Sequence, residues 1–199
     1  MLGKLFLKSL LALIVITLIC AAYTEVVTVI GQTFFSKQAN GSLITEKNKV
    51  KGSSLIAQPF TSRKYLWGRQ MNISLGNLNG VGGDTTMYST ASQMSPDNHS
   101  YQTTIKQTAH VVQQLDPQER NHSVPVDLIT NSGSGLDPDI SPRAAKYQVK
   151  RIAAARGLKT TVVQKIINQY TKQRTLGILG EPRVNVLQVN LALDRLRVQ

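Results

Sequence analysis

The longest apolar run of the chain covers residues 5–24, and within it only Lys8 is charged. Twenty residues of α-helix span about 30 Å, which matches the hydrocarbon core of a bilayer. A helix is the expected form because lipid offers no partner for open backbone polar groups. No comparable run occurs elsewhere in the sequence. The pattern predicts one transmembrane helix over about residues 5–30, inside an N-terminal segment 1–36.

Two other interpretations of this run remain open. A cleaved signal peptide also combines a basic start, an apolar middle and small residues, here at positions 20–22. A lipoprotein signal would be processed at Cys20, but the bulky Ile19 stands where a small residue is expected. The sequence stays apolar beyond Ala22, which favours a retained anchor.

The charges beside the run predict its orientation. Lys4 and Lys8 lie at the N-terminal side, and short basic N-termini tend to stay cytoplasmic. Long domains translocate largely regardless of their own charge, although the lysines of residues 37–51 compete with this signal. We expect a single-pass protein of the inner (plasma) membrane, with its N-terminus in the cytoplasm and its large C-terminal domain extracytoplasmic.

Residues 37–199 predict one mixed soluble domain, so the fold class is α+β with a single N-terminal transmembrane helix. The Asn40-Gly41 pair favours a turn, and residues 50–56 are strand-like. Short strands and turns close to the membrane are expected over 38–67. Residues 68–94 are rich in Gly, Asn, Ser and Thr, which is typical of a long surface loop.

The second half of the domain alternates helix signals with turns. Ser-Pro pairs, which cap and begin helices, predict helices starting at Ser95 and Ser141. The first should end at Asp116-Pro117 and the second at Gly157. A third helix is expected over 161–172.

Two segments carry strand signals. Residues 124–130 form a short apolar run with a proline near its start, which predicts a strand. In the last segment Asn185 and Gln188 resemble a capping pair and favour a final helix. Because residues 184–193 also alternate, a strand there stays open.

The chain is strongly basic, with a net charge of +12, and most of the excess lies in residues 143–199. These bases are spread along helices without a clustered arm or interleaved aromatic residues, so we expect no nucleic-acid partner. A solvated basic surface beside anionic lipid or an acidic partner subunit fits better. The single cysteine lies in the apolar run, which removes disulfides, thiolate metal sites and a cysteine nucleophile from the polar domain.

No motif supports catalysis by this chain alone. Residues 80–84 are glycine-rich but lack the lysine and spacing of a Walker loop. There is no Gly-x-Ser-x-Gly elbow, so an anchored hydrolase is a weak hypothesis. The segment that P-type pumps phosphorylate, Asp-Lys-Thr-Gly-Thr, is missing. The histidines 99, 110 and 122 have no metal-pair spacing and are expected on the surface. We therefore predict neither catalytic nor metal-binding residues.

The loop 131–140 is the richest in glycine, serine and aspartate. It either makes a tight connection into the helix at Ser141 or forms an anion site from its amides and the helix N-terminus. Asp137 and Asp139 would repel phosphate, which favours the connection.

Several ordered motifs are similar to those of one protein family. They comprise 38–43, 52–60, 124–128, 132–142 with 144–145 and 148–149, and 180–187 with 190–194. Together with the single N-terminal span, this sequence resembles the C subunit of the Kdp-type potassium-transporting P-type ATPase of bacteria. The motif residues singled out, without an assigned role, are Ser132, Gly133, Ser134, Gly135, Asp137, Pro138, Gly180, Glu181, Pro182, Arg183 and Asn185. The sequence departs from the family after the aromatic segment (68–72) and in the following loop (81–85).

The resemblance implies a non-catalytic subunit of a high-affinity potassium-uptake pump. Its implied partners are a potassium-carrying A subunit, an ATP-hydrolysing B subunit, a small F subunit and the membrane. The family role is assembly, or a catalytic chaperone that raises the ATP affinity of the B subunit, so ATP is implied through the complex. The chaperone role conflicts with the expected topology, because ATP is cytoplasmic. An extracytoplasmic domain would instead dock on the A subunit. The alternative function is a membrane-anchored extracytoplasmic binding module for an anionic ligand.

Overall fold

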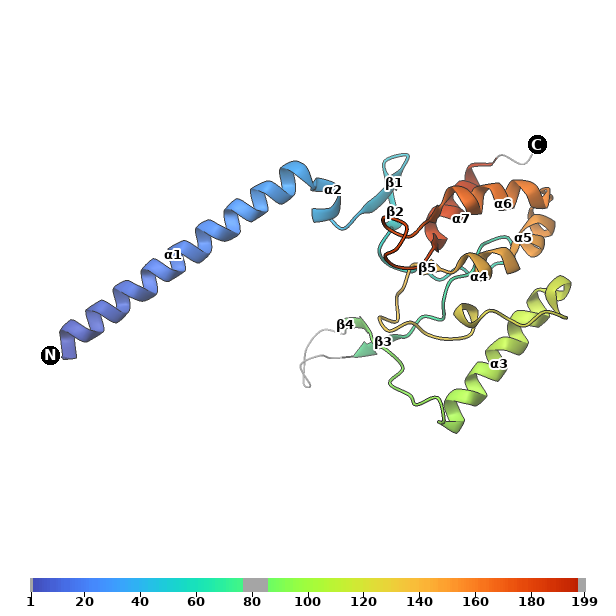
Figure 1. The fold of residues 1–199 in the computed structure, drawn as a ribbon, viewed down its shortest axis with the longest axis horizontal. Helices are drawn as coiled ribbons and strands as arrows, with labels where there is room; N and C mark the ends of the chain where they lie inside the picture. The colour runs from blue at the N-terminus through green and yellow to red at the C-terminus, as the bar shows by residue number, and fades with distance from the viewer. Residues whose placement is uncertain (1, 77–85, 197–199) are drawn as a thin grey trace. The chain divides into compact units, whose positions relative to one another are not determined.

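The computed structural model describes residues 2–76 and 86–196. It divides into two compact units, 1–51 and 52–199 (Figure 1). The first half of the chain contains α1 Leu2–Phe34, α2 Ser36–Ala39, β1 Leu43–Glu46, β2 Lys49–Ser53, β3 Ile73–Gly76 and β4 Thr86–Ser89. The second half contains α3 His99–Leu115, the 3₁₀ turns η1 Pro117–Glu119 and η2 Val126–Leu128, β5 Asp139–Ile140, α4 Pro142–Tyr147, α5 Val149–Arg156, α6 Thr160–Gln169, β6 Thr171–Lys172, β7 Arg183–Asn185 and α7 Val186–Arg195.

The first unit is dominated by α1, which confirms the predicted N-terminal helix and extends it at both ends. Its span 3–34 is long and apolar enough to cross a membrane. Two hydroxyls inside it are satisfied locally, because Thr17 donates to the Leu13 carbonyl at 2.8 Å and Thr24 to the Cys20 carbonyl at 2.9 Å. The apolar side chains of α1 are exposed, as an outward-facing membrane helix requires. The predicted turn at Asn40-Gly41 precedes the β1–β2 hairpin.

The second unit is a mixed domain in which α4 and α7 pack against β7 of a small antiparallel sheet of order β5–β7–β6. Figure 1 shows α4 to α7 gathered together, with α5 beside α6. The core combines residues from these helices and β7, including Ile152, Val163, Ile167, Val184 and Leu193. The α+β class predicted from the sequence is thereby confirmed.

Capping and helix-end signals in the sequence predicted the bounds of several elements correctly. The Ser141 hydroxyl accepts a bond from the Ala144 amide at 3.2 Å and caps α4 as predicted. Gly157 ends α5 with φ of 64°, where a β-carbon would be strained. Asn185 caps α7 by accepting a bond from the Gln188 amide at 3.1 Å. Both interpretations of 184–194 hold in part, since β7 is a strand and α7 a helix.

Other expectations were wrong. The run 124–130 contains the 3₁₀ turn η2 instead of a strand, because Pro125 starts a turn that lets Asp127 accept a bond from the Ser141 amide at 2.8 Å. The helix predicted from Ser95 begins at His99, because Asn98 caps it through the Tyr101 amide at 3.1 Å.

Two further helices are shorter than expected. The helix predicted from Ser141 to Gly157 is divided at Gln148, whose side chain is used elsewhere in the fold. The helix expected over 161–172 ends at Gln169, because 171–172 pair with β7.

The long surface loop expected over 68–94 is only partly irregular. Residues 73–76 and 86–89 pair as the antiparallel hairpin β3–β4, with Ile73 opposite Ser89. The central glycine-rich segment 80–84 lies outside the described residues.

Candidate functional site

The two most specific sequence motifs meet at the sheet. β5 and β7 pair with Asp139 opposite Asn185, and the Val186 amide donates to the Pro138 carbonyl at 3.0 Å. Asn185 donates to Asp139 Oδ1 at 2.9 Å and to the Ser54 carbonyl at 3.0 Å. Arg183 Nε lies 3.0 Å from Asp139 Oδ2. Asp139 and Asn185 thus join three distant stretches of chain.

Backbone amides of the loop before β5 donate hydrogen bonds to side chains of the same loop. The Leu136 amide donates to Ser134 Oγ at 3.2 Å, and the Asp137 amide donates to Ser132 Oγ at 3.4 Å. Asp137 Oδ1 in turn accepts a bond from the Asp139 amide at 3.0 Å. Amides bonded in this way are not offered to an anion, which supports the tight connection over an anion site.

Gly135 fixes the position of this loop in the domain. Its φ is 72°, its carbonyl accepts a bond from the Asn72 amide at 3.1 Å, and it is buried. A β-carbon there would lie 2.7 Å from the Thr90 carbonyl oxygen. Gly133 is exposed, and no described atom lies within 4 Å of a β-carbon built on it.

The remaining motif residues lie apart from this cluster. Gly180 and Glu181 are exposed in the connection between β6 and β7, and Pro182 is half-buried. Glu181 forms a bidentate pair with Arg174, with both bonds at 2.7 Å. The sequence therefore groups residues that the structure divides between a partly buried junction and an exposed loop.

A second polar cluster holds residues 63–67 against the helices. Asn190 accepts a bond from the Leu66 amide at 2.7 Å and donates to the Leu66 carbonyl at 2.9 Å. Gln148 does the same for Trp67, at 2.8 and 3.0 Å. All four residues are buried, so each amide side chain satisfies a backbone segment that has no strand partner.

Arg151 completes this cluster and is only 4 % exposed. It donates to the carbonyls of Arg63 and Tyr65, and to Gln148 Oε1 at 2.6 Å. Burial lowers the pKa of its guanidinium to about 10. The expectation of a solvated basic surface is therefore wrong for this residue.

Asp116 lies beside Arg151, with its Oδ2 3.6 Å from the Arg151 Nε. It is 1 % exposed, and neither oxygen has a hydrogen-bond partner within the described part of the chain. Burial raises the pKa of its carboxyl, and the nearby Glu119 adds to that rise, although Arg151 acts against it.

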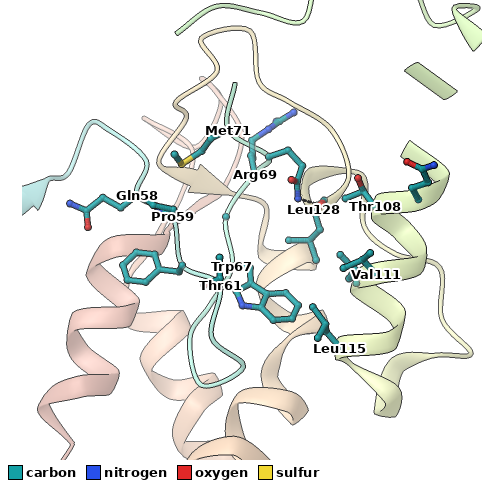
Figure 2. Close-up of a pocket in the computed structure, with 15 residues that line it drawn as sticks. Gln58, Pro59, Thr61, Trp67, Arg69, Met71, Thr108, Val111, Leu115 and Leu128 are labelled. Carbon is teal, nitrogen blue, oxygen red and sulfur yellow. Dashed lines mark hydrogen bonds between the residues drawn. The ribbon is translucent and has the colours of Figure 1, made fainter. Parts of the chain in front are cut away.

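An apolar groove of about 420 Å³ lies between residues 58–71 and α3. Figure 2 shows Val111 and Leu115 of α3 facing Thr61 and Trp67 across it. Leu128 closes one wall. The groove offers shape and apolar surface but no pair of groups suited to acid–base or nucleophilic chemistry.

A second hollow, of about 690 Å³, is lined by basic side chains. Arg143, Lys146 and Lys150 lie on it, and Lys150 forms a 2.7 Å ion pair with Glu119. His122 pairs with the same carboxylate at 2.8 Å.

The three histidines are exposed, as predicted from their spacing. Among residues 2–76 and 86–196, no group of three His, Cys, Asp or Glu side chains could hold a metal ion.

The sequence motifs included Gln148 and Asn190, but the sequence did not show that both side chains bind the same backbone segment. Arg151 was missed altogether as a structural residue. The only sign of its burial in the sequence is its position, because Arg151 directly precedes the core residues Ile152 and Ala153 on the short helix α5.

Comparison with known proteins identifies the family of the chain. The profile of the family described as "K+-transporting ATPase, c chain" matches residues 6–195. The chain belongs to this family. It is 46 % identical over 192 residues to the potassium-transporting ATPase KdpC subunit of Clostridium perfringens, covering 96 % of this chain and 97 % of that protein.

Other relatives give the same result. The KdpC subunit of Methylococcus capsulatus is 46 % identical over 193 residues, covering 96 % of this chain and 98 % of its own length. That of Herpetosiphon aurantiacus is 44 % identical over 193 residues, covering 96 % of each chain. As a KdpC family member the chain is a non-catalytic accessory subunit of the Kdp ATPase, with other Kdp subunits as its partners.

Proposed function

We propose that this KdpC chain assembles the pump from outside the membrane, with residues 1–36 as the anchor and 37–199 as a soluble docking domain. The N-terminus would be cytoplasmic and the domain extracytoplasmic. The observation that carries the proposal is α1, a single exposed apolar helix with Lys4 and Lys8 at its N-terminal end.

The proposed partners are the potassium-carrying A subunit, the ATP-hydrolysing B subunit and the small F subunit. Two features of the domain support a docking role rather than a catalytic one. Its buried polar groups hold backbone segments in place, and its open groove is apolar. An exposed apolar groove suits recognition of another protein.

Topology is tested by adding protease to right-side-out spheroplasts that hold the intact complex, with a cytoplasmic protein as control. Cleavage of the domain from outside is the expected result. Full protection that is lost on lysis would contradict the orientation and make nucleotide contact the leading explanation.

Assembly is tested by purifying the complex through a tag on the ATP-hydrolysing subunit. This chain should co-purify, and its deletion should abolish growth at low potassium. A chain that purifies alone as a stable monomer, with potassium uptake intact, would overturn the proposal.

The catalytic-chaperone role would require an indirect effect if the domain lies outside. It predicts that the ATP affinity of the ATP-hydrolysing subunit falls when this chain is missing from the complex. An unchanged affinity for ATP would leave assembly as the role of the chain.

The anionic-ligand module is the second candidate, and the basic hollow lined by Arg143, Lys146 and Lys150 favours it. It predicts that the full chain binds inorganic phosphate or a polyanion in a salt-sensitive manner. Lys146→Gln should weaken that binding, whereas Lys165→Gln, outside this hollow, should not. Binding that ignores both salt and Lys146 would exclude this function.

A further inference from the structure

The basic hollow of the second unit takes its cations from the consecutive helices α4 and α5. Arg143, Lys146 and Lys150 follow one another at spacings of three and four residues, as on one helix face, and all three line the hollow. In the described part of the chain, Lys146 has no ion pair or hydrogen bond, and Arg143 makes one bond, to Ser123 Oγ at 3.3 Å. Both side chains therefore have donors left for an anion.

Tyr147 lines the same hollow and has a hydroxyl without a partner. The residue is 8 % exposed, and its hydroxyl is buried with no hydrogen bond to any described residue. Burial raises the pKa of this phenol, and the nearby Asp116 and Glu119 add to the rise, so the hydroxyl remains a donor at neutral pH. A buried donor without an acceptor costs free energy, which points to an acceptor that the chain itself does not supply.

The first turn of α6 adds backbone donors. α4 contacts α6, and Thr160, the first residue of α6, lines the hollow. The N-cap residue Lys159 makes no side-chain hydrogen bond to the helix, and the first turn contains no acidic residue. A helix N-terminus without a side-chain cap offers free amides and a partial positive charge, and both favour a bound anion.

One carboxylate within this basic hollow narrows the choice of anion. Glu119 is 8 % exposed, and its Oε1 lies 2.7 Å from Lys150 Nζ while its Oε2 lies 2.8 Å from His122 Nδ1. Each oxygen has a second lone pair, so Glu119 can accept a further bond. It would repel a fully deprotonated anion such as sulfate, whereas an anion with its own hydroxyl could donate to it.

We propose that this hollow binds the inorganic hydrogen phosphate ion. Arg143 and Lys146 supply the balancing charge, and the Tyr147 hydroxyl and the first-turn amides of α6 donate hydrogen bonds to the ion. Glu119 accepts a bond from the hydroxyl of the ion, because phosphate keeps a proton at neutral pH and sulfate does not. A volume of about 690 Å³ leaves room for hydration waters around the ion. The inference rests on the anionic-ligand function proposed above, because it names the anion.

Calorimetric titration of the full-length chain in phosphatidylcholine nanodiscs, at constant ionic strength, tests the choice of anion. Phosphate should bind at one saturable site, about tenfold or more tighter than sulfate, because only phosphate gains the bond to a charged acceptor. Lys146→Gln should weaken phosphate binding about tenfold, whereas Lys165→Gln, outside the hollow, should leave it unchanged. Sulfate binding as tight as phosphate binding would overturn the phosphate site and leave the anionic-ligand function standing. No saturable binding of either ion would overturn both.

Glu119→Gln tests the origin of the selectivity. Without the negative charge, sulfate should bind more tightly than to the wild type, and the preference for phosphate should fall below about threefold. Because the variant should gain sulfate affinity, a loss of fold cannot produce the expected result. A preference equal to that of the wild type would contradict the role of Glu119.

Tyr147→Phe tests the buried hydroxyl independently of Glu119. Phenylalanine keeps the ring and removes only the unpartnered donor, so the unfolding midpoint should be unchanged or raised. Phosphate and sulfate should both bind about fivefold more weakly. Wild-type affinity for both ions would mean that the hydroxyl does not face the anion, which would overturn the site.

Competition separates the free ion from other carriers of phosphate. ATP, or vesicles of phosphatidylcholine that contain phosphatidic acid, are added to the chain with phosphate bound. Each should displace phosphate less effectively than further inorganic phosphate does. More effective displacement by ATP would assign the hollow to a nucleotide, and by the vesicles to a lipid headgroup. Either result would overturn the proposal.

Discussion

The guanidinium carbon of Arg151 lies 3.5 Å from the centroid of the Trp67 ring. The same side chain donates to two carbonyls of residues 63–67, so it joins α5 to a segment more than eighty positions earlier in the sequence. A buried cation that is stacked and multiply bonded stabilises this region only while the carbonyl groups and the indole ring that it contacts stay in place.

Arg151→Met should lower the free energy of unfolding by about 3 kcal/mol, because it removes the donor to the Arg63 and Tyr65 carbonyls and leaves Asp116 without its counter-charge. Urea unfolding followed by the fluorescence of Trp67, the single tryptophan, measures both the midpoint and the local contact. Arg151→Lys should recover only part of the loss, because lysine lacks the planar fork. A midpoint equal to the wild type in Arg151→Met would contradict this account.

Asp116→Asn should stabilise the chain at neutral pH. The folded pKa of Asp116 is raised above its ordinary value of 3.8, so the folded state favours the protonated form. Its contribution is therefore fully present below that value and is lost as pH rises through the folded pKa. The urea midpoints of wild type and variant should converge at about pH 3 and separate with increasing pH. A variant that is less stable at pH 7 would show that the attraction of Arg151 outweighs burial.

Gly135→Ala should cost about 2 kcal/mol or more, because alanine is strained at a φ of 72° and its methyl group would meet the Thr90 carbonyl. Gly133→Ala is the matched control two residues away, where the described surroundings are open. Thermal unfolding of the two full-length variants compares them directly. Equal midpoints for both would contradict the close approach at Gly135.

Asn185→Ala should cost about 2 to 3 kcal/mol, because it removes the α7 cap together with two bonds to Ser54 and Asp139. Gln164→Ala breaks only one exposed bond to Asn168 on α6 and should cost less than about 0.5 kcal/mol. Denaturant unfolding of the two variants measures the difference between their free energies of unfolding. A cost for Asn185→Ala as small as that of the control would mean the junction does not depend on this side chain.

Features set by neighbouring residues could be predicted from the sequence. The apolar run of α1, the Ser141 cap, the Gly157 stop and the Asn185 cap each depend on chemistry within a few positions, and each occurs where it was predicted.

Features set by distant residues could not. The division of the helix at Gln148 occurs where its side chain is bonded to Trp67, 81 positions away. The 3₁₀ turn at 126–128 lets Asp127 accept a bond from the Ser141 amide, 14 positions later. The burial of Arg151 needs carbonyls that no local pattern reveals. The candidate motifs could be recognised in the sequence, but only the fold separates the partly buried Asp139–Asn185 junction from the exposed 175–181 loop.

The long sequence separation of these bonds also constrains when the domain can form. Asn185 reaches back 131 positions to Ser54, and Asn190 reaches back 124 positions to Leu66. Such closures are slow and come late, because chain entropy must be lost before the contacts compensate for it. During synthesis, α1 emerges first and the residues that complete the domain emerge almost last. A ribosome that stops before Asn185 therefore leaves an anchored but open chain, a ready substrate for proteolysis.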